Sequence, residues 1–450
     1  MRGLKHLFGY CRNNLLKRKT SGLIIRSPSG DFQPPKGTLP IEPDGLPSGK
    51  AGPTAGAAQP IKEVTLKRSI YMDYSATTPV DPRVVEAMAP YWSDVFGNTS
   101  SVHAWGQAAA TALEGARERV ARILGCRPSE IIFTASGTEA DNLALRGVAW
   151  AARRSGRGNH IVTTPIEHHA VEATVEQLHH LFGFEVTVVP VDGHGLVDPE
   201  EVRRAIRPDT ILVSVITASN EVGTIQSIPE IAAVCREHGI PCHTDAVQAT
   251  GRMPLNVEEL GVDLLALSAH KFYGPKGVGL LYVRRGLALV PAITGGGHEG
   301  GRRPGTVNVA GIVGLAIALE RAEAAREEET ARLARLRDRL IEGVLSAIPD
   351  VRLTGHPTRR LCHLASFAIR GVEGASVVIG LDLEGIAASS GAACSEGEAR
   401  PSPVLEAMGL PPEWAVGGLR LSLGRQNTEE DVEAVLEVLP RVVARLREPM

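Results

Sequence analysis

The feature that most constrains the fold is a regular alternation of short β-branched runs with longer amphipathic stretches, which begins near residue 70 of this 450-residue chain. Seven runs are typical of strands, at 130–134, 160–164, 185–190, 211–216, 242–245, 264–268 and 279–283. Helical periodicity lies between them, at 108–124, 139–152, 171–180, 199–206 and 228–237. This alternation predicts an α/β fold with a mostly parallel central sheet and helices on both faces.

A long helix and a second group of strands follow the alternating region. The helix is predicted over 307–347, because Glu and Arg recur at three- and four-residue spacing in its middle. Strands at 351–354, 364–368 and 420–422 and a helix at 428–447 predict a smaller C-terminal α+β domain. We expect a large domain over 81–328 and a small domain formed by 67–80 together with 329–450.

The N-terminal residues 1–66 differ in composition from the rest. They hold 9 Gly and 8 Pro and carry a net charge of +6, whereas the remaining residues carry −9. Loop-forming residues predict a disordered tail without a packed core. The first 30 residues contain seven basic residues and no acidic one, which is also typical of an organelle transit peptide. A disordered extension is the favoured interpretation of the tail, so the predicted location is the cytoplasm. The alternative is the mitochondrial matrix, if the tail is a transit peptide.

Charge and cysteine usage exclude several classes of protein. No uncharged apolar run reaches the length of about 18 residues that a membrane span needs, so no membrane partner is expected. The net charge of −3 argues against direct binding of nucleic acid. The cysteines are far apart without a CxxC pair, which favours a reducing compartment and no bound metal. They are Cys11, Cys126, Cys235, Cys242, Cys362 and Cys394.

Ligands of parallel sheets bind at the carboxyl ends of the strands, and the first such loop spans 135–142. Its sequence, Ala-Ser-Gly-Thr-Glu-Ala-Asp-Asn, joins a predicted strand to a predicted helix. The backbone at Gly137 and the hydroxyl of Thr138 could bind a phosphate at the helix N-terminus. The alternative is a helix cap in which Thr138 and Asp141 form a capping box.

Two further strand ends carry residues suited to a cofactor. Lys271, in Ser-Ala-His-Lys, could form a Schiff base with an aldehyde cofactor; the alternatives are a surface lysine or the nearby Lys276. Asp245 ends an apolar strand, where a protonated pyridine nitrogen or a simple helix cap would account for it.

Three more residues could take part in chemistry. His168 could stack on a cofactor ring or move protons, or it could lie in a solvated loop. Cys394 stands in a small, polar stretch and could be a reactive thiol. Arg420 lies in an apolar strand and needs a carboxylate, from a substrate or from an internal salt bridge. Together the candidates describe a pyridoxal phosphate enzyme that acts on an amino acid with a nucleophilic cysteine.

Three motifs carry a resemblance to a known family. They are Tyr71-Met-Asp-Tyr-Ser-Ala-Thr-Thr-Pro-Val80, the run Ser-Ala-His-Lys-Phe-Tyr-Gly-Pro-Lys-Gly that ends at Gly277, and Ser-Ser-Gly-Ala-Ala-Cys394. In them the chain resembles the cysteine desulfurases of the NifS/IscS type, in the class V aminotransferase family. The resemblance continues to Arg425 and implies a fold type I enzyme that uses pyridoxal 5'-phosphate.

The resemblance also implies roles for individual residues. Lys271 would bind the cofactor and shuttle protons, His168 would stack on its ring, and Asp245 would pair with the ring nitrogen. Further cofactor contacts are implied for Gln248, Asn220, Gly137, Thr138, Ser268, His270 and, from a neighbouring subunit, Thr306. Arg420 and Asn220 would bind the substrate carboxylate.

The implied reaction removes sulfur from L-cysteine, gives L-alanine and leaves a persulfide on Cys394. The implied partners are a second copy of the chain and a sulfur-acceptor protein, either an iron–sulfur scaffold or a sulfur carrier that serves cofactor or tRNA thiolation. Two other hypotheses stay open. One is a selenocysteine lyase or another class V lyase or aminotransferase, and the other is a scaffold subunit without activity.

Overall fold

The computed structural model describes residues 69–391 and 401–448, so the predictions for 1–66 and for Cys394 lie outside the described residues.

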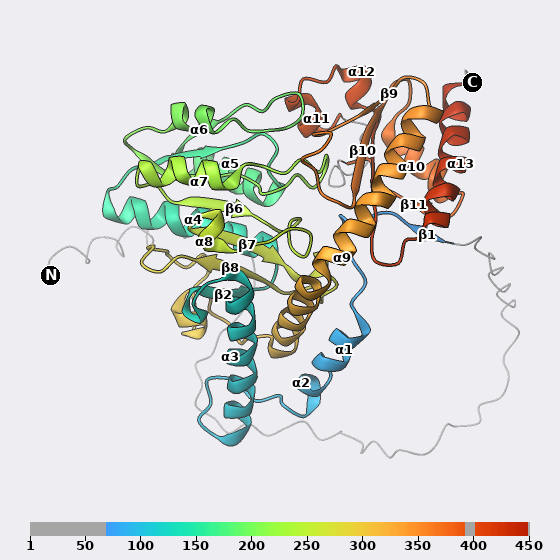
Figure 1. The fold of residues 1–450 in the computed structure, drawn as a ribbon. Coiled ribbons are helices and arrows are strands. Elements are labelled where there is room, and N and C mark those ends of the chain that lie inside the picture. Colours follow the sequence, from blue (N-terminus) through green and yellow to red (C-terminus); the bar gives the residue numbers. More distant parts are fainter. Residues whose placement is uncertain (1–68, 392–400, 449–450) are drawn as a thin grey trace, which may run out of the picture. The chain divides into compact units, whose positions relative to one another are not determined.

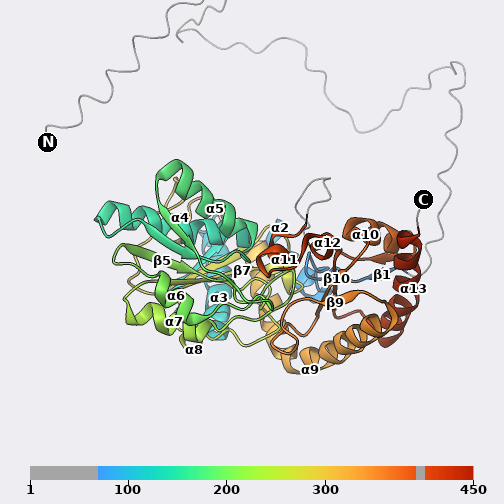
Figure 2. The ribbon, with the colours of Figure 1, turned by 90° about the horizontal axis from the view of Figure 1, so that it is seen from above.

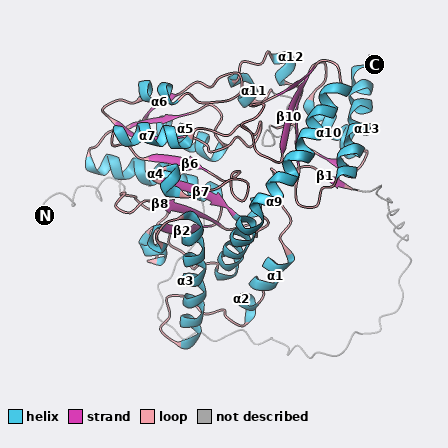
Figure 3. Ribbon diagram, in the orientation of Figure 1, coloured by secondary structure: helices cyan, strands magenta, loops and turns pink. Residues whose placement is uncertain are grey.

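Figure 3 shows the helices and strands. The strands are β1 (Ile70–Tyr71), β2 (Ile131–Thr134), β3 (His160–Thr163), β4 (Glu185–Val188), β5 (Thr210–Ser214), β6 (Cys242–Asp245), β7 (Leu264–Ser268), β8 (Gly279–Val283), β9 (Val351–Leu353), β10 (Leu364–Ile369), β11 (Ile386–Ala387) and β12 (Gly418–Ser422). The α-helices are α1 (Pro82–Met88), α2 (Pro90–Ser93), α3 (Ala104–Leu124), α4 (Gly137–Ser155), α5 (His169–Phe182), α6 (Pro199–Ala205), α7 (Ile228–Glu237), α8 (Val257–Leu260), α9 (Val309–Ala347), α10 (Gly374–Asp382), α11 (Pro403–Ala407), α12 (Pro412–Ala415) and α13 (Glu429–Arg447). Short 3₁₀ helices are η1 (Pro128–Glu130), η2 (Ala269–Lys271) and η3 (His298–Gly301).

Seven strands form the central sheet in the order β2-β8-β7-β6-β5-β3-β4 (Figure 1). Strand β8 is antiparallel to β2 and β7, while the other neighbouring pairs are parallel. The structure thus confirms the predicted α/β fold with a mostly parallel sheet. Because all the strands except β8 point the same way, the loops after β2, β3, β5, β6 and β7 meet at one edge.

Both faces of the central sheet are covered by helices (Figure 2). Ile131 and Phe133 of β2 pack into the core that α3 shares, whereas Ile132 between them packs into the core of α4 and α5. Strands buried on both faces are nearly continuous apolar runs, and this pattern is why the sequence locates them well.

A smaller C-terminal part has its own sheets and core. Strands β12, β10 and β9 form an antiparallel sheet, and β1 pairs in parallel with β11 through Ile70 and Ile386. Ile70 and Met72 are buried in this second core beside Phe367 and Leu421. The first described segment of the chain is therefore packed with the last strands.

The 39-residue helix α9 contributes to both cores. Ile312 and Leu319 are buried in the core of the large sheet, and Leu340 and Val344 in the core of the C-terminal part. Within the described ranges, no helix combines the length and the apolar character that crossing a membrane requires. The finer domain division into 81–328 and 67–80 with 329–450 stays a prediction.

Candidate active site

A cavity of about 270 Å³ lies at the carboxyl edge of the central sheet. It is lined by every predicted site residue except Thr306 and Cys394. Its walls also include residues without a predicted role, namely Ser75, Ala76, Ser136, Asp141, Ile216 and Val247. The structure therefore brings together residues that the sequence places up to several hundred positions apart, while their roles stay predictions.

The two remaining predicted residues are not part of this cavity. Thr306 is exposed in the loop before α9, and its reach to a neighbouring subunit stays a prediction. Cys394 lies outside the described residues. Gly391 and Pro403, which flank the segment with Cys394, line a smaller cavity of about 50 Å³ together with His168.

The N-terminus of α4 is capped by Ser136. Its Oγ accepts a hydrogen bond from Glu139 N at 3.1 Å, and the carboxylate of Glu139 accepts one from Ala135 N at 2.6 Å. The interpretation in which Thr138 and Asp141 form the capping box is therefore wrong. The hydroxyl of Thr138 has no hydrogen-bond partner within the described ranges, which leaves it available to a ligand in the cavity.

Gly137, the first residue of α4, lets the helix approach two other loops closely. A Cβ added to it would lie 2.9 Å from Val247 Cγ2 and 3.2 Å from Ser268 Cβ, so a side chain does not fit. The first residues of α4, Gly137 and Thr138, thus line the cavity together with Ser268 and His270. A helix N-terminus with adjacent hydroxyl groups is a binding site for a phosphate.

Lys271 is the lysine of the cavity. Its Nζ donates hydrogen bonds to the carbonyl oxygens of Ser75 at 2.6 Å and Ala76 at 2.7 Å. Burial, and then the nearby charge of Arg420, lower the pKa of Lys271 to about 8. The alternative residue, Lys276, is exposed and does not line the cavity.

Asp245 lies at the end of β6 and is 3% exposed. Its Oδ1 accepts a hydrogen bond from Val247 N at 2.8 Å within a turn, and no helix begins there, so the helix-cap alternative is wrong. Burial raises the pKa of Asp245, and the charges of His168 and Lys271 oppose this rise. A cationic nitrogen against the carboxylate would hold Asp245 in its ionised form.

His168 and His169 have different surroundings. His168 lines the cavity and caps α5, because its Nδ1 accepts a hydrogen bond from Ala170 N at 3.1 Å. Burial lowers the pKa of His168, and in the neutral ring the proton then lies on Nε2. His169 is the exposed first residue of α5 and pairs with Glu172 at 2.7 Å, whereas His168 lies in the cavity wall, so the solvated-loop interpretation does not hold.

Arg420 forms the internal salt bridge that the sequence left as an alternative. The residue is 2% exposed, and its Nη2 lies 2.8 Å from Asp73 Oδ1. Its Nη1 donates to the carbonyl oxygen of Asn220 at 2.9 Å. Because Arg420 also lines the cavity, a substrate carboxylate would share the guanidinium with Asp73 or take its place.

Asp141 is the main residue that sequence reasoning missed. It is buried, its Oδ1 lies 3.5 Å from His243 Nε2, and neither atom has a hydrogen bond within the described ranges. Burial raises the pKa of Asp141 and lowers that of His243 to about 3, which describes a neutral pair beneath the cavity. Its position one turn after Gly137, on the same helix face, was a signal that could have found it.

The cavity fits the cofactor that the resemblance implies. The N-terminus of α4 could bind its phosphate. The buried Asp245 could pair with its basic ring nitrogen, and Lys271 offers an amine for its aldehyde. The Oε1 atom of Gln248 is buried and lacks a partner within the described ranges, although its Nε2 donates to Ser75 O at 2.8 Å. An unpaired acceptor in the wall fits a ligand that donates a hydrogen bond there.

The chain is similar to several known proteins. A family model described as aminotransferase class-V matches residues 70–435. The chain is 48% identical over 384 residues to the cysteine desulfurase IscS of Dictyoglomus turgidum, covering 85% of this chain and 96% of that protein. It is 51% identical over 383 residues to the cysteine desulfurase IscS of Methanosarcina thermophila, with 85% and 94% covered. Among solved structures, a NifS-like protein superposes with a TM-score of 0.78 at 38% identity, over 84% of this chain and all of that one.

Proposed function

Because the chain belongs to the aminotransferase class-V family, we propose that it is a pyridoxal-phosphate-dependent cysteine desulfurase. It removes sulfur from L-cysteine and releases L-alanine. The observation that carries the proposal is Lys271, a buried amine in a cavity that also holds Asp245, in a chain about half identical to named cysteine desulfurases. When bound, pyridoxal phosphate supplies an electron sink that weakens the bonds around the substrate α-carbon.

Five residues bind and orient the cofactor. Lys271 would hold its aldehyde group, because an amine with a pKa of about 8 is partly neutral near neutral pH and therefore nucleophilic. Asp245 would pair with the ring nitrogen, which would keep the buried carboxylate ionised. Thr138, Ser268 and His270 bind the phosphate together with the N–H groups of α4.

Arg420 and His168 act on the substrate. The Arg420 guanidinium already holds one carboxylate, that of Asp73, and the substrate carboxylate binds to the same fork. His168 and Lys271 line the same cavity and move the proton of the α-carbon.

Cys394 accepts the sulfur. Its thiolate forms an S–S bond to the substrate sulfur while the C–S bond breaks, and the carbon keeps the electron pair of that bond. The carbon is then protonated and leaves as alanine, and Cys394 carries a persulfide. A persulfide is transferred to another thiol by exchange, so we propose a sulfur-acceptor protein, an iron–sulfur scaffold or a sulfur carrier, in a reducing compartment such as the cytoplasm.

Mass spectrometry of the full-length holoenzyme tests this function. After treatment with L-cysteine, the peptide with Cys394 should carry one additional sulfur atom, and alanine should accumulate. Cys394→Ser should abolish the added sulfur, whereas Cys362→Ser, a cysteine outside the large cavity, should not. Absence of alanine from a cofactor-loaded protein would reject the function, and unchanged activity of Cys394→Ser would favour a lyase such as selenocysteine lyase.

A surface of exposed apolar side chains supports a homodimer. Trp92, Phe96 and Trp105 are 65%, 66% and 59% exposed, and Val102 between them is 88% exposed. Ser100 Oγ lies 3.5 Å from His298 Nδ1, which joins this surface to the loop that carries Thr306. An apolar surface of this kind is usually covered by a partner. A second copy of the chain would cover it and would receive Thr306 in its own cavity.

The substitution Trp105→Glu should convert the dimer into a monomer. In a two-fold interface it buries two unpaired carboxylates, which should weaken association at least about 100-fold. Light scattering after size-exclusion chromatography measures the mass of the particle. Leu181→Glu is the matched control, because Leu181 is 71% exposed on α5, and it should leave the dimer intact. A folded Trp105→Glu dimer would place the interface elsewhere.

A further inference from the structure

Tyr273, two residues after Lys271, has a backbone conformation that residues with a Cβ rarely adopt. Its φ is +66°, and the residue is 9% exposed. A buried residue keeps such a conformation only where the surrounding structure holds it. Tyr273 shares a tight turn with Lys271, in which Phe272 N and Gly274 N both donate to Ala269 O. The position of Lys271 therefore depends on the contacts that keep Tyr273 in this conformation.

The polar groups of Tyr273 are all bound by residues outside this turn. Its N–H donates to Thr78 Oγ1 at 2.8 Å, and its carbonyl oxygen accepts from Asp81 N at 3.0 Å. Its phenol oxygen accepts from Arg425 N at 2.6 Å. The guanidinium of Arg425 also lies over the ring, 4.1 Å from its centre. Arg425 thus contacts Tyr273 at both the hydroxyl and the aromatic face.

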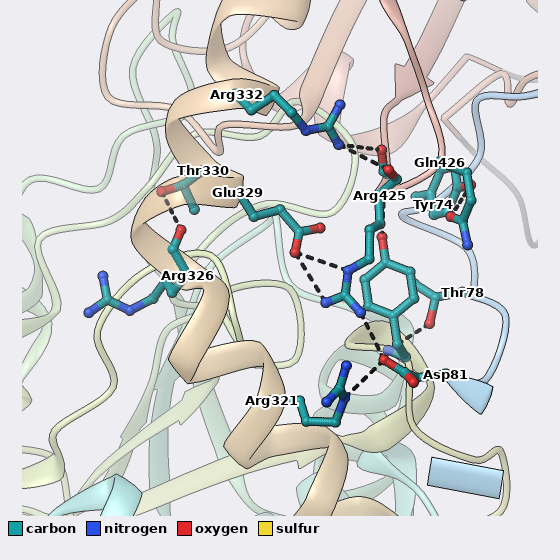
Figure 4. Close-up of polar contacts among 12 residues, drawn as sticks. Tyr74, Thr78, Asp81, Arg321, Arg326, Glu329, Thr330, Arg332, Arg425 and Gln426 are labelled. Atoms are coloured by element: carbon teal, nitrogen blue, oxygen red, sulfur yellow. Dashed lines mark hydrogen bonds and ion pairs between the residues drawn. The ribbon is translucent and has the colours of Figure 1, made fainter. Parts of the chain in front are cut away.

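Arg425 is itself fixed by two carboxylates, which Figure 4 shows around it. Its Nη1 donates to Asp81 Oδ2 at 3.1 Å, and its Nε and Nη2 donate to Glu329 Oε2 at 3.2 and 3.1 Å. Arg321 Nε donates to the same oxygen of Asp81 at 3.0 Å. Glu329 and Arg321 lie on α9, so Arg425 connects the turn to the helix that both cores share.

Lys271 and Arg425 also lie on one small cavity. Its volume is about 20 Å³, which is room for about one water molecule. Tyr273 and Glu329 line it as well. Lys271 therefore borders the large cavity and this small one, and movement of Arg425 or Tyr273 would loosen the packing around the lysine side chain.

We propose that Arg425 is a positioning residue for the lysine that binds the cofactor. Through Tyr273 it holds the turn so that Lys271 Nζ stays on the carbonyl oxygens of Ser75 and Ala76, within reach of the large cavity. The charges that shift the pKa of Lys271 are those of Arg420, Arg252, Asp245 and Asp73, and Arg425 is not among them. Arg425 acts by position, and a lysine in its place would keep the charge while losing the planar fork. The catalytic consequence rests on the proposed function, but the effect on Lys271 itself does not.

The test measures how Lys271 titrates in the full-length chain after its cofactor is removed. Acetic anhydride labels neutral amines, and mass spectrometry of the Lys271 peptide gives the labelling rate at each pH. Wild type should show a midpoint near pH 8. In Arg425→Lys and in Tyr273→Phe, the displaced amine should be less buried, and the midpoint should rise by about one unit, with labelling about tenfold slower on the acid side.

Arg339→Lys is the matched control. Arg339 lies on α9 and makes the same kind of forked contact with Glu433 on α13, at 2.7 and 3.0 Å, on the exposed side of the C-terminal part. The variant Arg339→Lys should leave the pH midpoint of Lys271 labelling unchanged. In the holoenzyme, the visible absorption band of the lysine-bound cofactor should titrate at an altered pH in Arg425→Lys and not in Arg339→Lys.

Two outcomes decide the inference. An unchanged midpoint in folded Arg425→Lys and folded Tyr273→Phe would overturn it, with folding checked by circular dichroism. If Arg425→Lys does not fold, Tyr273→Phe, which removes only the hydroxyl, decides alone. Because labelling needs no cofactor, a chain without desulfurase activity would still show the shift, so failure of the function and failure of this inference are distinguishable. Where both hold, kcat should fall about 10–100-fold in Arg425→Lys with KM little changed.

Discussion

Replacing Lys271 with alanine should lower the rate of alanine formation from L-cysteine by about 10³–10⁴-fold. The reason is that no other lysine lines the cavity in the part of the chain that the structure describes. The nearby Arg420 is a guanidinium engaged by Asp73 and Asn220, so it cannot replace the amine. Steady-state assays of alanine, with the absorption spectrum of the bound cofactor, measure the effect.

Lys276→Ala provides the matched control for this variant. Lys276 lies five positions further along the same loop but is exposed, so its removal should change the rate by less than about twofold. The visible absorption band of the lysine-bound cofactor should disappear in Lys271→Ala and persist in Lys276→Ala. If both variants keep near-normal rates, Lys271 has no part in the reaction.

Replacing Asp245 with asparagine should reduce the rate by roughly 10²–10³-fold, because a buried charge that faces the ring nitrogen is lost. Asparagine keeps an oxygen that can accept the hydrogen bond from Val247 N, so the turn after β6 should stay intact. The variant therefore separates the effect of the charge from that of the hydrogen bond in the turn. The rate of alanine formation at saturating L-cysteine is the measurement.

The same variant should stabilise the chain without cofactor. Burial raises the pKa of Asp245, so the folded state binds its proton more tightly than the unfolded state does. The resulting loss of stability develops as pH rises from the unfolded pKa through the folded pKa, and asparagine removes it. The thermal midpoint of Asp245→Asn should therefore exceed that of wild type near neutral pH and match it in acid.

Asp263→Asn is the control for the loss of an aspartate carboxylate next to the central sheet but outside the cavity. Asp263 precedes β7 and accepts from Cys242 N at 2.9 Å, with Arg284 Nε 2.9 Å from its other oxygen. Its loss should cost stability through these contacts and leave the rate nearly unchanged. Equal losses of rate in both variants would show that Asp245 acts only as a structural residue.

The central sheet could be predicted from the sequence because its strands are buried on both faces. The boundaries of β6 and β7 match the prediction, and α9 begins two residues later than predicted. Strands β1 and β11 were missed, since each has two residues and pairs only with the other across most of the chain. Helices α1, α2, α8, α10, α11 and α12 were also missed, and most of them are too short for helical periodicity to show.

The candidate site was predictable where side chains at strand ends carry a chemical signature. Lys271 and Asp245 belong to this class, and both line the cavity. The carbonyl oxygens of Ser75 and Ala76, which hold Lys271, could not be predicted, because backbone acceptors leave no mark on composition or spacing. The salt bridge between Asp73 and Arg420 could not be predicted either. The sequence indicated that Arg420 needs a carboxylate, but not that Asp73 provides it. The roles of Thr306 and Cys394 stay predictions.

The salt bridge between Asp73 and Arg420 has a consequence for biosynthesis. The two residues are 347 positions apart, so Asp73 leaves the ribosome long before its partner exists. At about 5–20 residues per second the interval is roughly 20–70 s. During that time, the segment that supplies the acceptors for Lys271 lacks its strand partner β11 and its ion pair. A nascent chain therefore cannot complete the cavity, and tight capture of the cofactor becomes possible only when translation is nearly finished.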